Sequence, residues 1–425
     1  MKPLPPSLKS VAHVLRRMTT AKWGGTETVV HQLARAYEAR GIHSPVHCTS
    51  MLSQPGVEIR DTVQIHRHRY LFPWLGLSAD DKQRLQLKGG SPLAPGILTD
   101  LLRQPGLSLI HTHVQLRLGG IARTAARLRR IPYVVSIHGG LLTTPAEQVE
   151  KMREPFAGKP EWGKAFGLLL GSRHVLRDAA AVICVGSDEA ALMRAKWPNL
   201  RIEYIPNGVD TATFSSATPD VFLRDHPQLA GKPFLLCVSR IDFQKNQLLL
   251  VRAFAEFSRN HPHHHLVLIG PVTVEDYQHQ IRQTAAELGI ADRLLIIPGF
   301  SPGDPRLASA FAAAETFVLP TDHEPFGIVI LEAWAAGKPV IATRVGGIPG
   351  FTTDGENIRL VPKGDATALA TALGELAAST ALREQLANAG RKLALETYDW
   401  SKVADRHLEL YQDILSRRGA GTQRF

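Results

Sequence analysis

Three observations predict an α/β protein with two domains, each a doubly wound parallel sheet. The 425 residues exceed what one hydrophobic core normally organises, so two domains of about 200 residues each are expected. Short β-branched runs alternate with amphipathic stretches of helical length, which is typical of parallel sheets covered by helices. Residues 207–232 are rich in turn formers and lack periodicity, which predicts a linker. The predicted domains are therefore 1–206 and 207–400.

The individual elements follow from these runs in chain order. In the first domain the predicted strands are Ser10–Leu15, Leu107–His111, Pro132–Ile137, Ala181–Val185 and Ile202–Ile205. In the second they are Phe234–Val238, His265–Ile269, Leu294–Ile297, Thr316–Leu319, Pro339–Ala342 and Arg359–Val361. Helices are predicted between them, with a last amphipathic one near the C-terminus: Glu27–Ala39, Leu248–Asn260, Val274–Leu288, Ile328–Ala336, Ala366–Ala378 and Ser401–Leu415.

The composition is that of a globular protein, with 44% hydrophobic and 21% charged residues. No apolar run approaches the roughly 20 residues that span a bilayer, and no signal peptide is evident, so the cytoplasm is the expected compartment. Cys184 and Cys237 lie within apolar runs, which predicts reduced, buried thiols. The net charge of +10 indicates an anionic partner: a phosphorylated substrate, an acidic membrane face or a nucleic acid.

The strongest candidate site follows the predicted strand Thr316–Leu319, where the chain reads TDHEPFGIVILEAWAAG. Pro325 and Gly327 mark a turn, and a helix is predicted from Ile328. Free amides at a helix N-terminus, with the helix dipole behind them, make a natural site for a diphosphate. Carboxylates accept pairs of hydroxyl hydrogen bonds, so Glu324 is expected to meet a sugar and Glu332 a ribose diol.

The string E-P-F-G-x-x-x-x-E from Glu324 to Glu332 resembles the signature of family-four retaining glycosyltransferases, which have the GT-B fold. That resemblance implies two Rossmann-like domains facing across a cleft, with 1–206 on the acceptor side and 207–400 binding the donor. It also implies that the stretch 401–425 crosses back to the first domain. Asn207-Gly208-Val209-Asp210 with Phe214 is similar to the segment that opens the family's linker, and Tyr398–Trp400 to the crossover.

Other motifs carry the resemblance through the chain. Gly24-Gly25-Thr26-Glu27 resembles the family's glycine-rich loop, where small residues let backbone amides approach phosphates. His138, which ends a predicted strand, is similar to the active-site histidine near the donor sugar. Arg240 and Lys245 resemble the pair that clamps the diphosphate, and two cations there would offset the charge of the leaving group. Pro298-Gly299-Phe300 resembles a segment beside the base, and Gly346-Gly347 a loop on the diphosphate side.

The chain departs from the family pattern at three positions. After the predicted strand His265–Ile269 it reads IleGlyProValThr, where the family often has a second glycine. Gly350 occupies a place that is often Glu, and Ile358 replaces a frequent Gly. Because the first of these loops lies near the nucleotide in the family, the identity of the donor base stays open among UDP, GDP and ADP.

Three further features of the sequence suggest a function but also have plainer structural explanations. The tract His261–His265 resembles a metal-binding run but lacks a carboxylate or cysteine at ligand spacing, so metal binding is not expected. Five arginines suggest either a basic surface or, as the favoured alternative, a solvated helix face: Arg117, Arg123, Arg127, Arg129 and Arg130. Residues 151–177 carry Trp162, Phe166 and Leu168–Leu170 among basic residues, which fits equally a membrane-interface segment or packed core.

These patterns and the resemblance together predict a retaining glycosyltransferase that uses a nucleoside diphosphate sugar donor and a hydroxyl acceptor, needs no metal or other cofactor, and acts in bacterial surface polysaccharide or glycolipid synthesis. Front-face attack, in which a phosphate oxygen takes the acceptor's proton, is implied by the resemblance. The expected catalytic residues are His138, Arg240, Lys245 and Glu324, and the expected donor-binding residues are Gly24, Gly25, Gly299, Phe326, Gly327, Ile328 and Glu332.

Two alternatives remain open: a sugar-nucleotide 2-epimerase of the same fold, and a non-catalytic sugar-nucleotide-binding subunit. The grouping of Arg240, Lys245, Glu324 and Glu332 favours an enzyme, and the E-P-F-G string favours transfer. The excess of basic over acidic residues suggests peripheral contact with the anionic inner face of a membrane. No motif supports a nucleic-acid partner, and none is expected.

Overall fold

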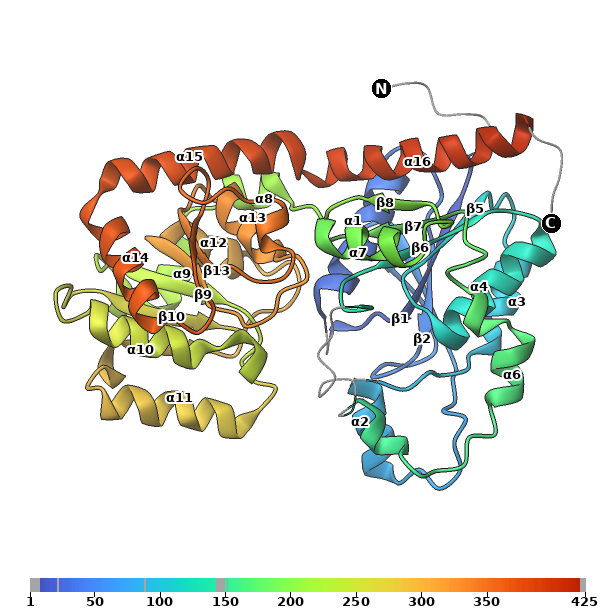
Figure 1. Cartoon of the computed structure of the whole chain (residues 1–425), viewed down its shortest axis with the longest axis horizontal. Helices are drawn as coiled ribbons and strands as arrows, with labels where there is room; N and C mark the ends of the chain where they lie inside the picture. The colour runs from blue at the N-terminus through green and yellow to red at the C-terminus, as the bar shows by residue number, and fades with distance from the viewer. Residues whose placement is uncertain (1–7, 21–22, 88, 143–149, 151, 421–425) are drawn as a thin grey trace. The chain divides into compact units, whose positions relative to one another are not determined.

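The computed structural model describes residues 8–20, 23–87, 89–142, 150 and 152–420. The chain divides into two compact units, one running to Pro206 and including the residues from Val403 onward, and the other spanning Asn207–Lys402 (Figure 1). Each unit has its own sheet covered by helices, as the alternation of strand and helix patterns predicts, and most strands of both sheets pair in parallel.

The sheet of the first unit has eight strands in the order β3-β4-β2-β1-β5-β6-β7-β8. The strands are β1 (Val11–Arg17), β2 (Val46–Thr49), β3 (Gly56–Arg60), β4 (Val63–His68), β5 (Leu109–Thr112), β6 (Tyr133–Ile137), β7 (Ala181–Cys184) and β8 (Ile202–Tyr204). The helices used below are α1 (Gly25–Glu38), α2 (Ala79–Leu87), α3 (Pro95–Arg103), α4 (Leu116–Arg129), α6 (Lys164–Leu169), α7 (Ser187–Lys196) and α16 (Trp400–Ala420).

The sequence patterns missed strands β2, β3 and β4, and the expectation of a purely parallel sheet is wrong for this unit. Strands β3 and β4 form an antiparallel hairpin, while β4 pairs in parallel with β2. The residues 46–49 and 63–68 carry three histidines and an arginine, so they lack the apolar runs by which the other strands were predicted. Their strand conformation depends on pairing with the rest of the sheet.

The second unit has a six-stranded sheet, entirely parallel, in the order β11-β10-β9-β12-β13-β14. The strands are β9 (Phe234–Val238), β10 (His265–Ile269), β11 (Leu294–Ile297), β12 (Thr316–Leu319), β13 (Val340–Thr343) and β14 (Arg359–Val361). The helices are α8 (Thr211–Ser215), α9 (Asp220–Asp225), α10 (Gln247–Phe257), α11 (Glu275–Glu287), α12 (Pro305–Ala313), α13 (Ile328–Ala335), α14 (Ala366–Ala378) and α15 (Thr380–Thr397). This strand order reverses between β9 and β12, which makes a crevice at their carboxyl ends.

The segment that begins the second unit is tied to the segment that ends it. Val209 N donates to the carbonyl of Tyr398 at 2.8 Å, and Trp400 N donates back to the Val209 carbonyl at 3.1 Å. A Cβ on Gly208 would lie 2.8 Å from the Trp400 ring, so only glycine fits beside the indole. The predicted linker 207–232 is therefore structured, and it contains helices α8 and α9.

Both units have continuous apolar cores, and the three cysteines lie inside them. Cys48, Cys184 and Cys237 are free and buried, as predicted for the last two. Burial raises the pKa of the Cys184 thiol to about 12 and that of Cys237 to about 11, so both stay protonated at neutral pH. Within the described residues, no helix is long and apolar enough to cross a membrane.

The expectation of a solvated helix face is wrong for Arg117 and Arg123 and holds for Arg127 and Arg130, which are exposed. The guanidinium groups of Arg117 and Arg123 are buried and pair with Glu161 and Asp178. Arg129 donates to backbone carbonyls at the end of α3, including that of Leu101 at 2.9 Å. Arg117, Arg123 and Arg129 therefore join α4 to neighbouring segments through partly buried carboxylates and carbonyls.

Candidate functional site

The reversal point of the second sheet brings together the loops that follow β9 and β12. Asp322 N donates to the Gln244 carbonyl at 2.8 Å, and the Gln244 side chain donates to the His323 carbonyl at 2.9 Å. The amide of Asn246 donates to Asp322 Oδ1 at 3.0 Å. Three hydrogen bonds thus fix the two loops to each other, and both carry residues predicted for the donor site.

The central contact of this site is an ion pair between the predicted residues Lys245 and Glu324. Lys245 Nζ lies 2.7 Å from Glu324 Oε2, and their side chains are only 12% and 13% exposed. A charged pair this poorly hydrated interacts more strongly than a surface salt bridge. Each loop supplies one partner, so the pair holds an ammonium group and a carboxylate at the carboxyl ends of neighbouring strands.

Arg240 stands at the same edge in a more open position. Its Nη1 lies 2.8 Å from Asp242 Oδ2, but 43% of the arginine side chain is exposed. Asp242 is held independently, because its other oxygen accepts a hydrogen bond from Lys245 N at 3.2 Å. A guanidinium group that is oriented by a carboxylate and still accessible can bind a phosphate with its remaining donors.

The turn Glu324–Gly327 leads into α13 as the sequence predicts. Gly327 has a φ of 99°, a conformation that favours glycine, and no side chain caps the helix there. The ring of Phe326 is buried against Phe351 with 4.6 Å between centroids, so its backbone and not its ring is available to a ligand. The first amides of α13, from Ile328, are therefore free of side-chain acceptors and suited to an anion.

The loop Gly346-Gly347 packs directly on this turn. Gly347 N donates to the Glu324 carbonyl at 2.9 Å. A Cβ on Gly346 would lie 2.2 Å from the Glu324 oxygen, and one on Gly347 would lie 2.1 Å from the Pro325 oxygen. Both glycines are thus required for the backbone of the candidate site to adopt its position.

Glu332 lies within α13, the helix that follows the turn Glu324–Gly327. Burial raises the pKa of its carboxyl to about 7. Among the described residues it has no hydrogen-bonding or charged partner, so nothing in the protein compensates for its desolvation. An unpaired carboxyl of this kind is suited to accept hydroxyl hydrogen bonds from a ligand.

The ends of β9, β10 and β11 approach one another through glycine. A Cβ on Gly270 would lie 1.8 Å from the Ser239 carbonyl oxygen, and one on Gly299 would lie 3.2 Å from the Gly270 backbone. Gly299 also has a φ of 98°. The loop that departs from the family pattern, Gly270-Pro271-Val272-Thr273, is therefore packed tightly against the loop that contains Arg240, through Ile241 N and the Pro271 carbonyl at 2.9 Å.

The remaining predicted residues, Gly24, Gly25 and His138, belong to the first unit. Gly24 caps α1 in an extended conformation, and its N–H donates to Glu27 Oε2 at 3.2 Å. Glu27 is buried, lies 3.8 Å from Arg17 Nε, and has its pKa raised by that burial. The GGxE sequence thus builds a capped helix N-terminus after β1.

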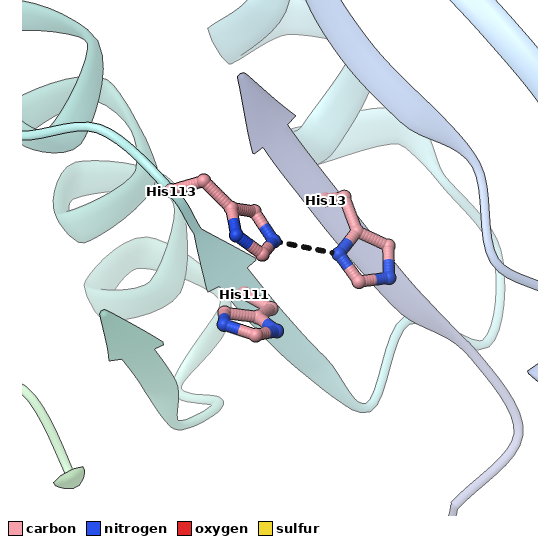
Figure 2. Close-up of side chains that lie close together, drawn as sticks. All are labelled: His13, His111 and His113. Carbon is pink, nitrogen blue, oxygen red and sulfur yellow. Dashed lines mark hydrogen bonds between the residues drawn. The ribbon is translucent and has the colours of Figure 1, made fainter. Parts of the chain in front are cut away.

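His138 follows β6 and belongs to a ladder of imidazoles. Its Nε2 lies 2.8 Å from His113 Nδ1, and His113 Nε2 lies 2.9 Å from His13 Nδ1. Figure 2 shows His13 and His113 pointing toward each other from neighbouring segments, with His111 beside them. Burial lowers the pKa of His138 to about 4 and that of His13 to about 3, so the ladder is uncharged at neutral pH.

A neutral ladder has two hydrogen-bonding directions, because each imidazole carries one N–H. His13 Nε2 and His138 Nδ1, at the two ends, are buried and have no partner. If the protons run toward His138, its Nδ1 is a donor and His13 Nε2 is a bare acceptor. If they run the other way, His13 Nε2 carries the N–H and His138 Nδ1 is the bare acceptor, so each direction leaves one buried N–H without a partner. His138 Nδ1 can therefore carry either an N–H or a lone pair.

Sequence reasoning missed His113, although a signal was present. His111-Thr112-His113 stands at the end of a predicted strand, as His138 does, and neighbouring parallel strands end at the same edge of a sheet. His111 plays a different part, because its nitrogens already bond Ser136 Oγ and the Tyr411 hydroxyl, each at 2.7 Å. Within the described residues, the tract His261–His265 forms no group of metal ligands. His264 pairs with Glu315, and His265 Nδ1 contacts the His263 carbonyl.

Comparisons with known proteins agree with this architecture. Residues 24–208 match the family described as Glycosyl transferase 4-like domain, and residues 222–393 match Glycosyl transferases group 1. A D-inositol 3-phosphate glycosyltransferase from Acidothermus cellulolyticus is 30% identical over 424 residues, covering 94% of this chain and 88% of that protein. The chain belongs to the family-four glycosyltransferases of the GT-B fold, so its reaction class is glycosyl transfer.

A second relative matches part of the chain. It is a GDP-mannose-dependent alpha-(1-6)-phosphatidylinositol monomannoside mannosyltransferase from Mycolicibacterium smegmatis, 33% identical over 248 residues, covering 56% of this chain and 63% of that protein. Among solved structures, sucrose-phosphate synthase from Thermosynechococcus elongatus aligns with a TM-score of 0.71 at 24% identity, over 96% of this chain and all of that one. Anabaena HepE in complex with UDP and glucose aligns equally well at 19% identity, over 95% of this chain. These likenesses confirm the predicted fold class.

Proposed function

We propose that this chain is a retaining glycosyltransferase that moves a sugar from a nucleoside diphosphate donor to a hydroxyl acceptor without a metal ion. The observation that carries the proposal is the Lys245–Glu324 pair beside the uncapped N-terminus of α13, at the strand-order reversal of the second sheet. This edge offers positive charge and free amides to a diphosphate, together with a carboxylate for sugar hydroxyls.

In the proposed reaction the bond between the anomeric carbon and the donor phosphate breaks while the acceptor oxygen attacks from the same face. Lys245, Arg240 and the amides from Ile328 stabilise the charge that develops on the leaving diphosphate. The acceptor's proton passes to an oxygen of that phosphate, so no separate base is required. Glu324 orients the sugar, Glu332 accepts from the ribose diol, and His138 polarises or positions the sugar.

The donor and acceptor are proposed by chemistry. The two curated relatives are named for an inositol phosphate and for GDP-mannose with a phosphatidylinositol mannoside. A phosphorylated cyclitol or its lipid would suit the net charge of +10. We therefore propose an anionic polyol or glycolipid acceptor and place the product in bacterial surface glycolipid or polysaccharide synthesis, with UDP, GDP and ADP donors to be compared.

The decisive experiment first screens UDP, GDP and ADP for thermal stabilisation, then assays the corresponding sugars with inositol phosphate and phosphatidylinositol. Lys245→Ala and Glu324→Ala are each expected to lower turnover at least about a hundredfold, because each removes charge or positioning at the leaving group. Lys232→Ala and Glu384→Ala, exposed residues of the same unit, serve as matched controls. Near-normal rates in both site variants would refute these roles.

Three further readouts address the finer claims. NMR of the product gives the anomeric configuration, and inversion would contradict the retaining mechanism. Unchanged turnover after chelator treatment is expected if no metal takes part. Incubation of the donor without acceptor should leave the sugar unchanged, whereas an isomerised product would favour the 2-epimerase alternative.

A peripheral membrane contact is proposed for α6 and its flanks. The helix buries none of its residues, and Leu168 and Leu169 are 77% and 80% exposed. Phe166 is also exposed, and Lys164 and Arg173 flank these side chains; Lys151, at the start of the predicted segment, lies outside the described residues. Apolar side chains rimmed by cations fit an anionic bilayer surface.

Sedimentation with phosphatidylcholine vesicles, with and without phosphatidylglycerol, tests the contact. The double variant Leu168→Ser, Leu169→Ser is expected to lose most of the binding, whereas Leu288→Ser, an exposed leucine of the other unit, should not. Equal sedimentation of both variants with anionic vesicles would contradict the proposal.

A further inference from the structure

A second cluster of histidines lies in the first unit, on the strands that the sequence patterns missed. His47 of β2 is the direct register partner of His66 of β4, and His68 follows two residues later on the same strand. Side chains at these positions share one face of the sheet, because successive residues of a strand point to opposite faces. Asp100, in the middle of α3, lies against the same imidazoles.

The ligand atoms of this cluster stand at the separations expected around a tetrahedral metal ion. His47 Nδ1 lies 3.4 Å from His68 Nε2, and His68 Nε2 lies 3.7 Å from Asp100 Oδ2. All three atoms lie within 4.8 Å of one another. Metal–nitrogen bonds of roughly 2.0–2.1 Å at tetrahedral angles place ligand atoms about 3.4 Å apart. The remaining pair, His47 Nδ1 and Asp100 Oδ2, lies within 4.8 Å, so the side chains would draw together around an ion.

The tautomer of His47 follows from a chain of hydrogen bonds behind it. The Ser10 hydroxyl donates to the His43 carbonyl at 2.9 Å, so its oxygen accepts from Gln104 Nε2 at 2.8 Å. This orientation of the Gln104 amide turns its oxygen toward His47 Nε2, which lies 3.3 Å away and must carry the proton. His47 Nδ1 is therefore a lone pair aimed at His68, the arrangement that orients metal-ligating histidines.

The other two ligands are also oriented by their surroundings. A Cβ on Gly96 of α3 would lie 2.9 Å from His68 Nδ1, so the glycine lets the helix approach the ring and fix its plane. His66 Nδ1 lies 3.6 Å from the same carboxylate oxygen of Asp100.

The other histidine group, His13, His111 and His113, lacks a carboxylate. Both nitrogens of His111 and both of His113 take part in hydrogen bonds, as do both nitrogens of His47 in the second cluster. Its three members are also buried. At the second cluster, the Asp100 side chain is 41% exposed, which leaves a route for an ion from solvent.

We propose that His47 Nδ1, His68 Nε2 and Asp100 Oδ2 bind a divalent transition-metal ion of the zinc class, with the fourth position open to solvent. Two imidazoles and a carboxylate match the ligand preferences of such ions. The bound ion joins β2, β4 and α3, which are far apart in sequence, and so stabilises the edge of the first sheet. This site is separate from the proposed donor site, and the proposal does not rest on the proposed function.

The test titrates tag-free, chelator-stripped full-length protein with Zn²⁺ alone, measures bound metal by mass spectrometry and follows thermal unfolding. One ion per chain is expected, with a rise in Tm. His68→Gln and Asp100→Asn should each weaken binding at least about tenfold, and Gln104→Leu, which removes the hydrogen bond behind His47, about 10- to 100-fold. His279→Ala, an exposed histidine of the other unit, is the matched control and should bind as the wild type does.

Equal Zn²⁺ affinity in wild type, His68→Gln and Asp100→Asn would overturn the proposal, as would a wild type whose Tm does not respond to the ion. If His68→Gln fails to fold, Asp100→Asn decides alone, because its side chain is partly exposed and the substitution preserves its shape. A Tm rise in wild type that is absent in Asp100→Asn, with equal Tm of both in chelator, supports the site.

Discussion

His113 links His13 to His138 by hydrogen bonds on both of its nitrogens, so it couples the proton positions of the two rings and orients His138. His113→Leu is expected to lower kcat about tenfold to a hundredfold with a smaller change in KM, because His138 loses its orientation. His113→Gln, which can donate at one end and accept at the other, should recover part of that loss. Steady-state kinetics across pH checks both variants.

The matched control for this substitution is His43→Leu, a half-exposed histidine of the same unit. Circular dichroism separates misfolding from a catalytic effect. Equal kcat for His113→Leu and His113→Gln, in folded proteins, would contradict a hydrogen-bonding role for the ladder.

Glu332 has a folded-state pKa of about 7, above the ordinary value of 4.5. The folded state therefore binds this proton more tightly than the unfolded state. Its stabilising contribution is fully present below pH 4.5 and is lost as the pH rises through about 7. Urea unfolding should show that wild type loses up to about 3 kcal/mol more stability than Glu332→Gln between pH 4.5 and pH 8. Parallel pH profiles of the two proteins would show that Glu332 is not desolvated.

At the scale of elements, the candidate donor site depends on close backbone contact between the turn Glu324–Gly327 and the loop Gly346-Gly347. Gly346→Ala would drive a Cβ into the Glu324 carbonyl, so the loop or the turn must move. We expect a loss of about 1–3 kcal/mol in stability together with weaker nucleotide binding. Calorimetric titration with the best nucleoside diphosphate and thermal unfolding measure both effects.

Gly374, in the same unit, is a glycine at which an added Cβ causes no clash. It lies within α14, and a Cβ there would meet nothing within 4 Å. Gly374→Ala is expected to leave nucleotide binding unchanged and to stabilise the protein by about 0.5–1 kcal/mol, because alanine favours helix. If both alanine variants weakened nucleotide binding alike, the contact at Gly346 would not explain the effect.

Elements differed in how far the sequence predicted them. Strands β9 to β12 and helix α13 are apolar runs with clear turn signals, and the predicted bounds of each agree within a residue or two. Strands β2 and β4 are of similar length but rich in histidine, so local patterns favoured no strand there. Their conformation depends on pairing with β1, a contact that a local window of sequence does not contain.

At the scale of the whole molecule, the first unit is completed by the end of the chain. Val403, Tyr411 and Ile414 of α16 are buried, and the Tyr411 hydroxyl lies 2.7 Å from His111 Nδ1. Arg40 pairs with Asp405 at 2.8 Å. Residues separated by three hundred positions or more therefore pack in the same unit.

Truncation after Lys402 tests this dependence. The shortened chain is expected to lose the cooperative unfolding of the first unit, because α16 no longer covers apolar surface there. The second unit, which lies within 207–402, should still unfold cooperatively and bind the nucleoside diphosphate. Limited proteolysis with and without nucleotide measures both. Survival of an intact, protease-resistant first unit would show that α16 is dispensable.

The sequence alone determined the α/β class, most strand positions and the residues from Glu324 to Glu332, because hydrophobic periodicity and turn chemistry act over a few neighbouring residues. Only the tertiary structure decided which side chains meet: Lys245 with Glu324, His113 with His138, and His47 with His68 and Asp100. It also turned Arg117 and Arg123 inward, against expectation. These side-chain contacts are set by strand order and register, which bring residues distant in sequence to the same edge of a sheet or onto one face.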